Sequence, residues 1–145
     1  METVERIQAG GKPIAIIVRK AFQEKGVHFF SPFEFSQQLG IIVHPPGHSV
    51  SPHIHKVIAR DVRVTQEVLH IIEGSLEITL YDEDKHYLTS HILNQGDTIL
   101  LAYGGHGIKI LTPSKILEVK QGPYAGAHDK TCFPGITLSR IQPEE

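Results

Sequence analysis

Apolar and polar residues alternate along several short segments of the chain, and this pattern predicts strands. The clearest case is LEITLY at residues 76–81, where apolar side chains occupy every second position. Because successive side chains of a strand point to opposite faces, such a segment has one buried and one solvated face. PIAIIVRK at residues 13–20 is rich in β-branched side chains, which also favour a strand.

Further predicted strands are short and are separated by turn residues. They cover residues 37–43, 67–72, 87–93, 98–102, 108–111 and 115–120, with another expected at 136–141. Pro-Pro-Gly at 45–47, Asn-Gln-Gly-Asp at 94–97 and Thr-Pro-Ser at 112–114 mark turns. The one helical turn expected lies at residues 21–25. About nine short strands with almost no helix indicate an all-β barrel or jelly roll.

The length of 145 residues predicts a single domain with its own core. We expect residues 1–36 to form an N-terminal arm and the first strands. Residues 37–122 form the predicted core barrel, and residues 123–145 form an irregular tail that packs on it. The tail is rich in proline and glycine.

Composition narrows the classes of partner. The chain has 14 Lys and Arg against 16 Asp and Glu, with no basic block, so nucleic acid is not expected as a partner. The single cysteine, Cys132, permits no internal disulfide. No apolar run approaches the ~18 residues of a membrane span, and the N-terminus has no apolar signal core. We therefore expect a cytoplasmic protein that does not bind membranes.

Ten histidines and no tryptophan are the unusual feature of the composition. His53 and His55 are two residues apart, so on a strand they point to one face. If that face lines the inside of a small barrel, the two imidazoles converge. Glu67 on a neighbouring strand then completes a set of ligands of the kind that a metal site needs.

The stretch from Gly47 to Gly74 resembles the first cupin motif, G-x5-H-x-H-x(3,4)-E-x6-G. Gly47, His53, His55, Glu67 and Gly74 match its fixed positions. The gap between His55 and Glu67 is eleven residues, which is longer than in the motif and indicates a longer connecting loop.

A second stretch, GDTILLAYGGH at residues 96–106, resembles the second cupin motif, G-x5-P-x-G-x2-H-x3-N. Gly96, Gly104 and His106 match in kind, while Ala102 replaces the proline and His106 comes one residue early. The resemblance covers residues 37–122 and implies a double-stranded β-helix, the cupin jelly-roll barrel.

The resemblance implies a metal centre and a small-molecule substrate. His53, His55, Glu67 and His106 would bind one divalent ion, for which Fe, Mn, Ni and Zn are the candidates. Such a centre would act on a small polar molecule by oxygenation or by isomerisation or epimerisation. The sequence names no catalytic residue beyond these ligands.

Four residues are candidate substrate contacts. Arg60 and Arg63 would hold an anionic group, because guanidinium binds carboxylate or phosphate bidentately. As an alternative, both pair with nearby carboxylates such as Asp61. Gln38 lies on the strand before the first motif, and Tyr124 lies with Lys120 and Gln121 where a barrel rim would meet the tail.

Two other functions fit the same residues. One is a metal-independent cupin that modifies a sugar nucleotide with histidine as acid and base, since imidazole titrates near neutral pH. The other is a binding module without catalysis. By analogy with small barrels that carry an extra N-terminal strand, we also expect a homodimer, with the Phe-rich segment 29–35 at the contact.

Overall fold

Ten strands and one short 3₁₀ helix make up residues 2–136, the part of the chain that the computed structural model describes. The strands are β1 (Val4–Ala9), β2 (Lys12–Val18), β3 (Gly26–Phe29), β4 (Gly40–Val43), β5 (Glu67–Glu73), β6 (Ser75–Tyr81), β7 (Tyr87–Asn94), β8 (Thr98–Leu101), β9 (Gly105–Ile110) and β10 (Lys115–Lys120). The 3₁₀ helix η1 spans Gly126–Asp129. No α-helix occurs within these residues, so the all-β prediction is confirmed and the helical turn at 21–25 is wrong.

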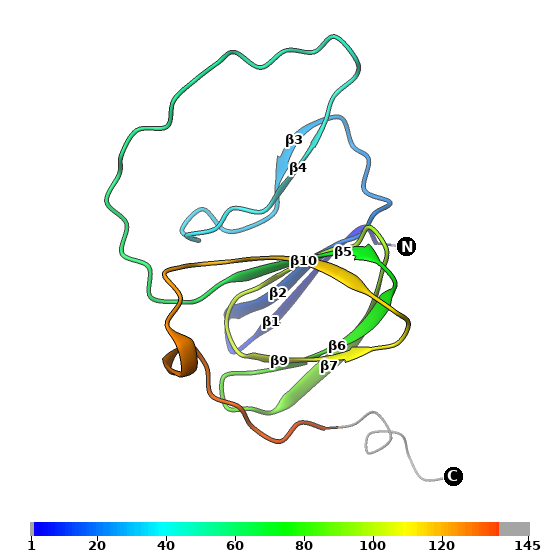
Figure 1. Cartoon of the computed structure of the whole chain (residues 1–145), viewed down its shortest axis with the longest axis vertical. Coiled ribbons are helices and arrows are strands. Elements are labelled where there is room, and N and C mark those ends of the chain that lie inside the picture. The colour runs from blue at the N-terminus through cyan, green and yellow to red at the C-terminus, as the bar shows by residue number, and fades with distance from the viewer. Residues whose placement is uncertain (1, 137–145) are drawn as a thin grey trace.

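The strands form three antiparallel sheets (Figure 1). One sheet has five strands in the order β1-β2-β8-β5-β10, and a second has three in the order β7-β6-β9. The third sheet is the hairpin β3-β4. Among residues 2–136 none of these sheets closes on itself, so the structure shows facing sheets where we predicted a closed barrel.

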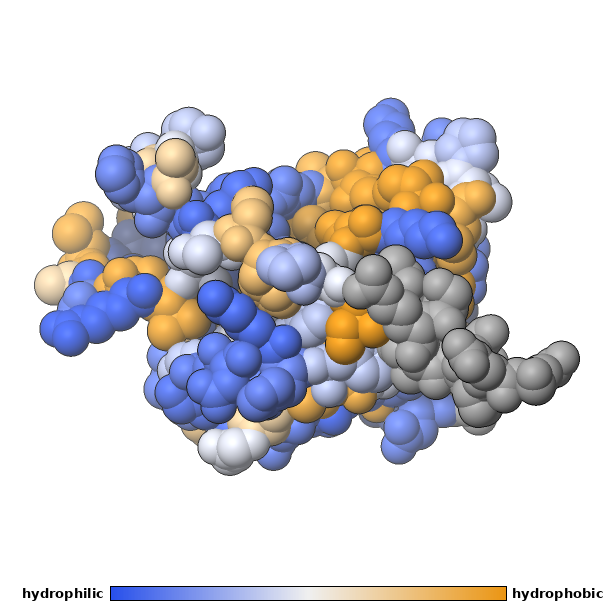
Figure 2. Space-filling view, turned by 90° about the horizontal axis from the view of Figure 1, so that it is seen from below, coloured by the Kyte–Doolittle hydropathy of each residue, from blue (hydrophilic) through white to orange (hydrophobic). Residues whose placement is uncertain are grey.

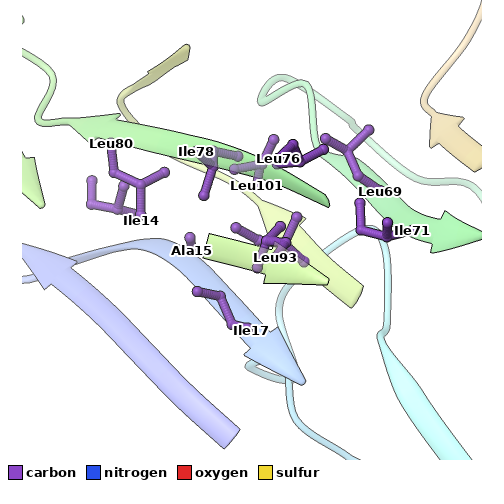
Figure 3. Packing of buried hydrophobic residues seen from close by; sticks show 11 residues of the cluster. Ile14, Ala15, Ile17, Leu69, Ile71, Leu76, Ile78, Leu80, Leu93 and Leu101 are labelled. Carbon is purple, nitrogen blue, oxygen red and sulfur yellow. The ribbon is translucent and has the colours of Figure 1, made fainter. Parts of the chain in front are cut away.

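The core lies between the five-stranded and the three-stranded sheets (Figure 3). Each strand contributes alternate side chains, as its apolar pattern requires. Leu76, Ile78 and Leu80 of β6 are fully buried against Ile14 and Ile17 of β2 and their neighbours. The alternation at residues 76–81 thus marks a face of the core.

Arg19 closes one side of this sandwich. Its guanidinium donates hydrogen bonds to the backbone oxygen of Ile92 in β7 at 2.7 Å and to Glu5 in β1 at 2.9 Å. It also pairs with Asp97 at 3.1 Å. The edge strands β1 and β7, which belong to different sheets, are therefore tied together.

The opposite side of the sandwich is open. Here β9 and β10 are edge strands, and neither has a further strand beside it among residues 2–136. Ile108 and Ile110 pair with Ile78 and Leu76, so they point to the core face, yet they are 45% and 51% exposed. We call this region, between β9 and β10, the open side.

The hairpin β3-β4 packs on the outer face of the five-stranded sheet. Ile41 of β4 joins Phe35 and Leu39 in a second apolar cluster, against Val18 and Leu100 of the sheet. The other face of the hairpin carries Val27, Phe29 and Ile42, which are 52%, 62% and 65% exposed. The face of the molecule seen in Figure 2 also has apolar patches between its hydrophilic residues.

Residues 44–66, which we call the strap, run in a wide arc from β4 to β5 (Figure 1). Residues 44–63 are all exposed, and the strap contains no strand. This differs from the predicted inward-facing strand with His53 and His55. A strand exists only when another strand pairs with it, and among residues 2–136 none is paired with the strap.

The other sequence predictions differ mainly at element boundaries. Residues 4–9 belong to a segment expected to form a loose arm or an edge element, and they form the edge strand β1 with β2 as its partner. The strand expected at 136–141 lies outside the described residues apart from Ile136. Within residues 2–136, the structure contains no helix that is both long and apolar enough to cross a membrane.

Candidate functional site

Glu67 and His106 meet at the open side of the sandwich. Glu67 begins β5 on the face that also carries the buried Leu69 and Ile71. His106 lies on β9 opposite the buried Leu80, so it too points toward the space between the sheets. Oε1 of Glu67 is 3.9 Å from Nε2 of His106, and the two side chains are 22% and 31% exposed. Two of the four predicted ligands are therefore adjacent.

Charged residues of β10 and of η1 surround this pair. Lys120 lies directly across from Glu67 in the β5-β10 register, and Glu118 lies on the same face of β10. Nζ of Lys120 is 3.4 Å from Oδ2 of Asp129, and Thr65 donates a hydrogen bond to the other oxygen of that carboxylate at 3.3 Å. Three carboxylates thus lie on one side of the site, and the ammonium of Lys120 pairs with that of Asp129.

The carboxyl group of Glu67 is a much weaker acid than an ordinary glutamate. Burial, a hydrogen bond shared with Glu118 and the charge of Glu118 raise the pKa of the Glu67 carboxyl to about 7. Lys120 opposes this rise but does not cancel it. Glu67 therefore gains and loses a proton near neutral pH, whereas an ordinary glutamate is ionised there.

The pKa of His106 is lowered, which keeps its ring neutral. Burial lowers the pKa of the imidazole, Lys130 lowers it further, and Glu118 partly offsets both. A neutral imidazole has one N–H donor and one acceptor nitrogen. The pair thus combines a carboxyl group that titrates near pH 7 with a neutral ring.

His53 and His55 lie apart from this pair. Both are exposed on the strap, with their ring centroids 5.2 Å apart, and Nδ1 of His53 lies 2.8 Å from the backbone oxygen of Ser51. Within one chain the four predicted ligands do not form a cluster. Glu67 and His106 offer one carboxylate and one neutral imidazole, which suits Fe, Mn, Ni or Zn, but a protein site for these ions needs further ligands.

Two of the predicted substrate contacts have local partners. Gln38 donates hydrogen bonds to the backbone oxygens of Pro32 and Phe35, and so stabilises the loop between β3 and β4. Arg63 pairs with Asp61 at 2.9 Å on the exposed strap, as the alternative interpretation expects.

The other two contacts are exposed. Arg60 lies on the strap, near Arg63 in sequence. Tyr124 is 84% exposed, and its ring centroid is 5.9 Å from Nζ of Lys120, so Tyr124 lies beside the Glu67–His106 site.

Sequence analysis missed Glu118 and Asp129. The alternation of Glu118 and Lys120 on a predicted strand was a usable signal, because it placed a carboxylate and an ammonium on one face. Asp129 could not be found from a pattern, since it lies in the irregular tail, which folds back to the site.

A second group of candidate ligands lies at the β6-β7 turn. Asp82, Asp84 and His86 have ligand atoms within 4.8 Å of one another, the one such group of three among the described residues. Oδ1 of Asp82 accepts hydrogen bonds from the backbone N–H groups of Asp84 and His86, each at 2.9 Å. The backbone hydrogen bond from His86 lowers the pKa of the Asp82 carboxyl. The hydrogen bonds of this hairpin turn therefore explain why the three side chains lie close together.

Comparison with known proteins adds no relative: no family model, no curated protein and no solved structure matches the chain. The geometry of the Glu67–His106 site is therefore the basis on which a function can be inferred.

Proposed function

We propose that this chain is a cupin-type protein that moves a proton on a small polar carbonyl compound, as in isomerisation or epimerisation. The observation that carries the proposal is the pair formed by Glu67, with a carboxyl pKa of about 7, and a neutral His106, 3.9 Å apart. A general base is most effective when its pKa is near the working pH. The two facing antiparallel sheets support the jelly-roll assignment.

The two groups have complementary roles. The ionised Glu67 removes a proton from the carbon next to the carbonyl group, while the N–H of neutral His106 donates a hydrogen bond to the carbonyl oxygen and stabilises the enolate that forms. The protonated Glu67 then returns the proton, either to the same carbon, once the bound enolate has turned its other face toward Glu67, or to the neighbouring carbon. The first return epimerises the substrate, and the second isomerises it once the oxygens have exchanged their proton through His106.

Deuterium exchange tests this function. The protein is incubated in D2O with a panel of hydroxy aldehydes, hydroxy ketones and nucleotide-linked keto sugars, and proton NMR follows exchange next to the carbonyl. We expect exchange with the unaltered protein and a loss of about 100-fold or more in Glu67→Gln. The matched control, Glu73→Gln, changes an exposed acid of the same strand and should retain exchange. Exchange that persists in Glu67→Gln would show that Glu67 is not the base.

A metal centre is the second candidate, because the neutral ring and the carboxylate are donors that a divalent ion accepts. In this case Glu67 and His106, together with His53 and His55, would hold the ion, which would supply Lewis-acid polarisation of a carbonyl oxygen.

Elemental analysis of untagged protein tests the metal centre. Near-stoichiometric Fe, Mn, Ni or Zn that is lost in both His53→Ala and Glu67→Gln would establish a centre that joins the strap to the sandwich. His86→Ala, at the β6-β7 turn, is the control and should keep its metal. Full occupancy in His53→Ala would remove His53 from the ligand set.

A further inference from the structure

The carboxylate of Asp129 lies beside the site, although Asp129 belongs to neither large sheet. We propose that Lys120 and Thr65 form a subsite for the carboxylate of a small molecule, and that the side chain of Asp129 occupies this subsite until such a ligand displaces it. The subsite stands on the contacts of Asp129 alone. Its consequence for catalysis, that the substrate is a carbonyl compound with a carboxylate of its own, rests on the proposed function.

Two donors from different parts of the chain meet at the carboxylate of Asp129. Nζ of Lys120, at the end of β10, is 3.4 Å from Oδ2. The hydroxyl of Thr65, at the end of the strap where it enters β5, donates a hydrogen bond to Oδ1 at 3.3 Å, and Figure 1 shows η1 beside this junction. An ammonium and a hydroxyl, each directed at one of the two oxygens, are the donors that a carboxylate needs.

Both donors are positioned by the five-stranded sheet. Lys120 is the last residue of β10 and is paired with β5. Gln66, the residue after Thr65, is 3% exposed, and its backbone N–H donates a hydrogen bond to Oε1 of Gln121 at 2.9 Å. The segments that carry the two donors are therefore held side by side by bonds that do not involve Asp129.

Asp129 itself is held by few contacts. It ends η1, a single 3₁₀ turn that buries none of its residues and has no side-chain cap. Its contact with Lys120, at 3.4 Å, is longer than the about 2.7–2.9 Å of a strong ammonium–carboxylate hydrogen bond. A free carboxylate has no chain attached and can approach both donors more closely. Because partly exposed ion pairs are weak, such a ligand can displace Asp129.

The charges around the subsite favour a single carboxylate over a more highly charged anion. Glu118 lies on the same face of β10 as Lys120, and its charge repels anions. A carboxylate that replaces Asp129 leaves the local charge unchanged, whereas a phosphate group brings about two negative charges. The charge of Asp129 also helps to raise the pKa of the Glu67 carboxyl, and a ligand carboxylate in the same place would have the same effect.

The position of the subsite indicates the class of substrate. Lys120 lies directly across from Glu67 in the β5-β10 register. A carboxylate bound to Lys120 and Thr65 would therefore leave the rest of a short molecule beside Glu67 and His106. The substrate class that fits both the subsite and the proposed base is a short keto acid.

An NMR titration with acetate tests the subsite without any measurement of activity. Acetate, or acetamide as its uncharged counterpart, is added to 15N-labelled protein at pH 7 and constant ionic strength. We expect acetate but not acetamide to shift the backbone amide signals of Thr65 and Lys120, with about fivefold tighter binding in Asp129→Ala than in the unaltered protein, because a weak internal competitor is removed. The matched control, Asp84→Ala, removes an exposed acid of the β6-β7 turn and should bind acetate as the unaltered protein does.

The same titration can overturn the proposal. Equal affinity for acetate in Asp129→Ala and in the unaltered protein would show that Asp129 blocks no subsite. A response that persists when Lys120→Gln is added to Asp129→Ala would remove Lys120 from the subsite. Tighter binding of inorganic phosphate than of acetate would overturn the assignment to carboxylates.

Deuterium exchange tests the consequence for the substrate. Relative to uncatalysed exchange of the same compounds, 2-oxobutanoate should exchange about tenfold faster than its amide, and Lys120→Gln should remove this preference. Equal enhancement for acid and amide would overturn the substrate class. If acetate binds as described but no carbonyl compound exchanges, the proposed function fails and the subsite stands.

Discussion

At the scale of single residues, the position of Glu67 explains its chemistry. It is the first residue of β5 and shares a face with Leu69 and Ile71, so its carboxyl group points toward the core. Glu118, on the same face of the neighbouring strand, adds a second carboxyl group. Burial and like charge both disfavour ionisation, which is why the pKa rises.

This position predicts how stability depends on pH. The Glu67 carboxyl has a pKa of about 7 in the folded chain and about 4.5 in the unfolded chain. Between these values the folded state keeps a proton that the unfolded state releases, so the free energy of unfolding falls as pH rises from about 5 to about 8. Glu67→Gln should remove this part of the fall and raise the free energy of unfolding by about 1 kcal/mol at pH 8. This gain is smaller than the whole pKa shift would give, because solvent reaches the carboxyl group and screens it.

Urea unfolding between pH 5 and pH 8 measures this effect. Glu73→Gln, an exposed change on the same strand, should follow the pH dependence of the unaltered protein. An identical fall in Glu67→Gln and in the unaltered protein would assign the pH dependence to other groups.

The residues of the site could be predicted only in part. Glu67 and His106 were identified from the sequence, because each lies at a motif position that falls on a core-facing strand. His53 and His55 follow the same motif, but their segment pairs with no strand in the described part of the chain, so spacing alone did not place them.

At the scale of elements, turn glycines determine where strands begin and end. Gly74 joins β5 to β6 with φ +87°, a left-handed conformation that favours glycine. A Cβ atom at this position would lie 2.3 Å from the backbone oxygen of Pro113 and 2.8 Å from Cα of Ser114. The turn therefore packs directly against the β9-β10 connection.

Gly74→Ala should destabilise the protein by about 3 kcal/mol, because the change adds both backbone strain and a collision with backbone atoms. Gly107→Ala is the matched control, since no atom lies within 4 Å of a Cβ there and its φ is ordinary. We expect the control to change stability by about 0.5 kcal/mol or less. Equal losses in thermal or urea unfolding would show that the collision at Gly74 is relieved elsewhere.

The elements themselves were predictable where pattern and pairing agree. β2, β5, β6, β7, β8 and β10 were all expected from alternation or from β-branched content. Residues 1–12 were interpreted as a loose arm or an edge element, and β1 is the edge strand of its sheet. β3 was missed, because the stretch around it shows no clear period of two. The strap was expected to contain a strand, but edge pairing depends on a partner that the local sequence does not specify.

At the scale of the whole molecule, the two sides of the sandwich differ in how they are held. Arg19 and its partners tie β1 to β7. On the other side, a turn at residues 111–114 connects β9 to β10, and the Glu67–His106 pair links β5 to β9. The outer and inner faces near β10 consequently remain accessible. This difference between the two sides follows from the order of the strands in each sheet, which the sequence did not reveal.

The strap also divides the chain into two pieces with separate roles. Residues before it supply β1 to β4, and residues after it supply the rest of both large sheets, including Glu67 and His106. The bond between Arg60 and Asp61 lies in an exposed stretch without strand pairing, where a protease can cut and where a gene can be split. Two fragments expressed together would reassemble through β2 and β8, giving a reporter in which reconstitution signals that two fused partners have met.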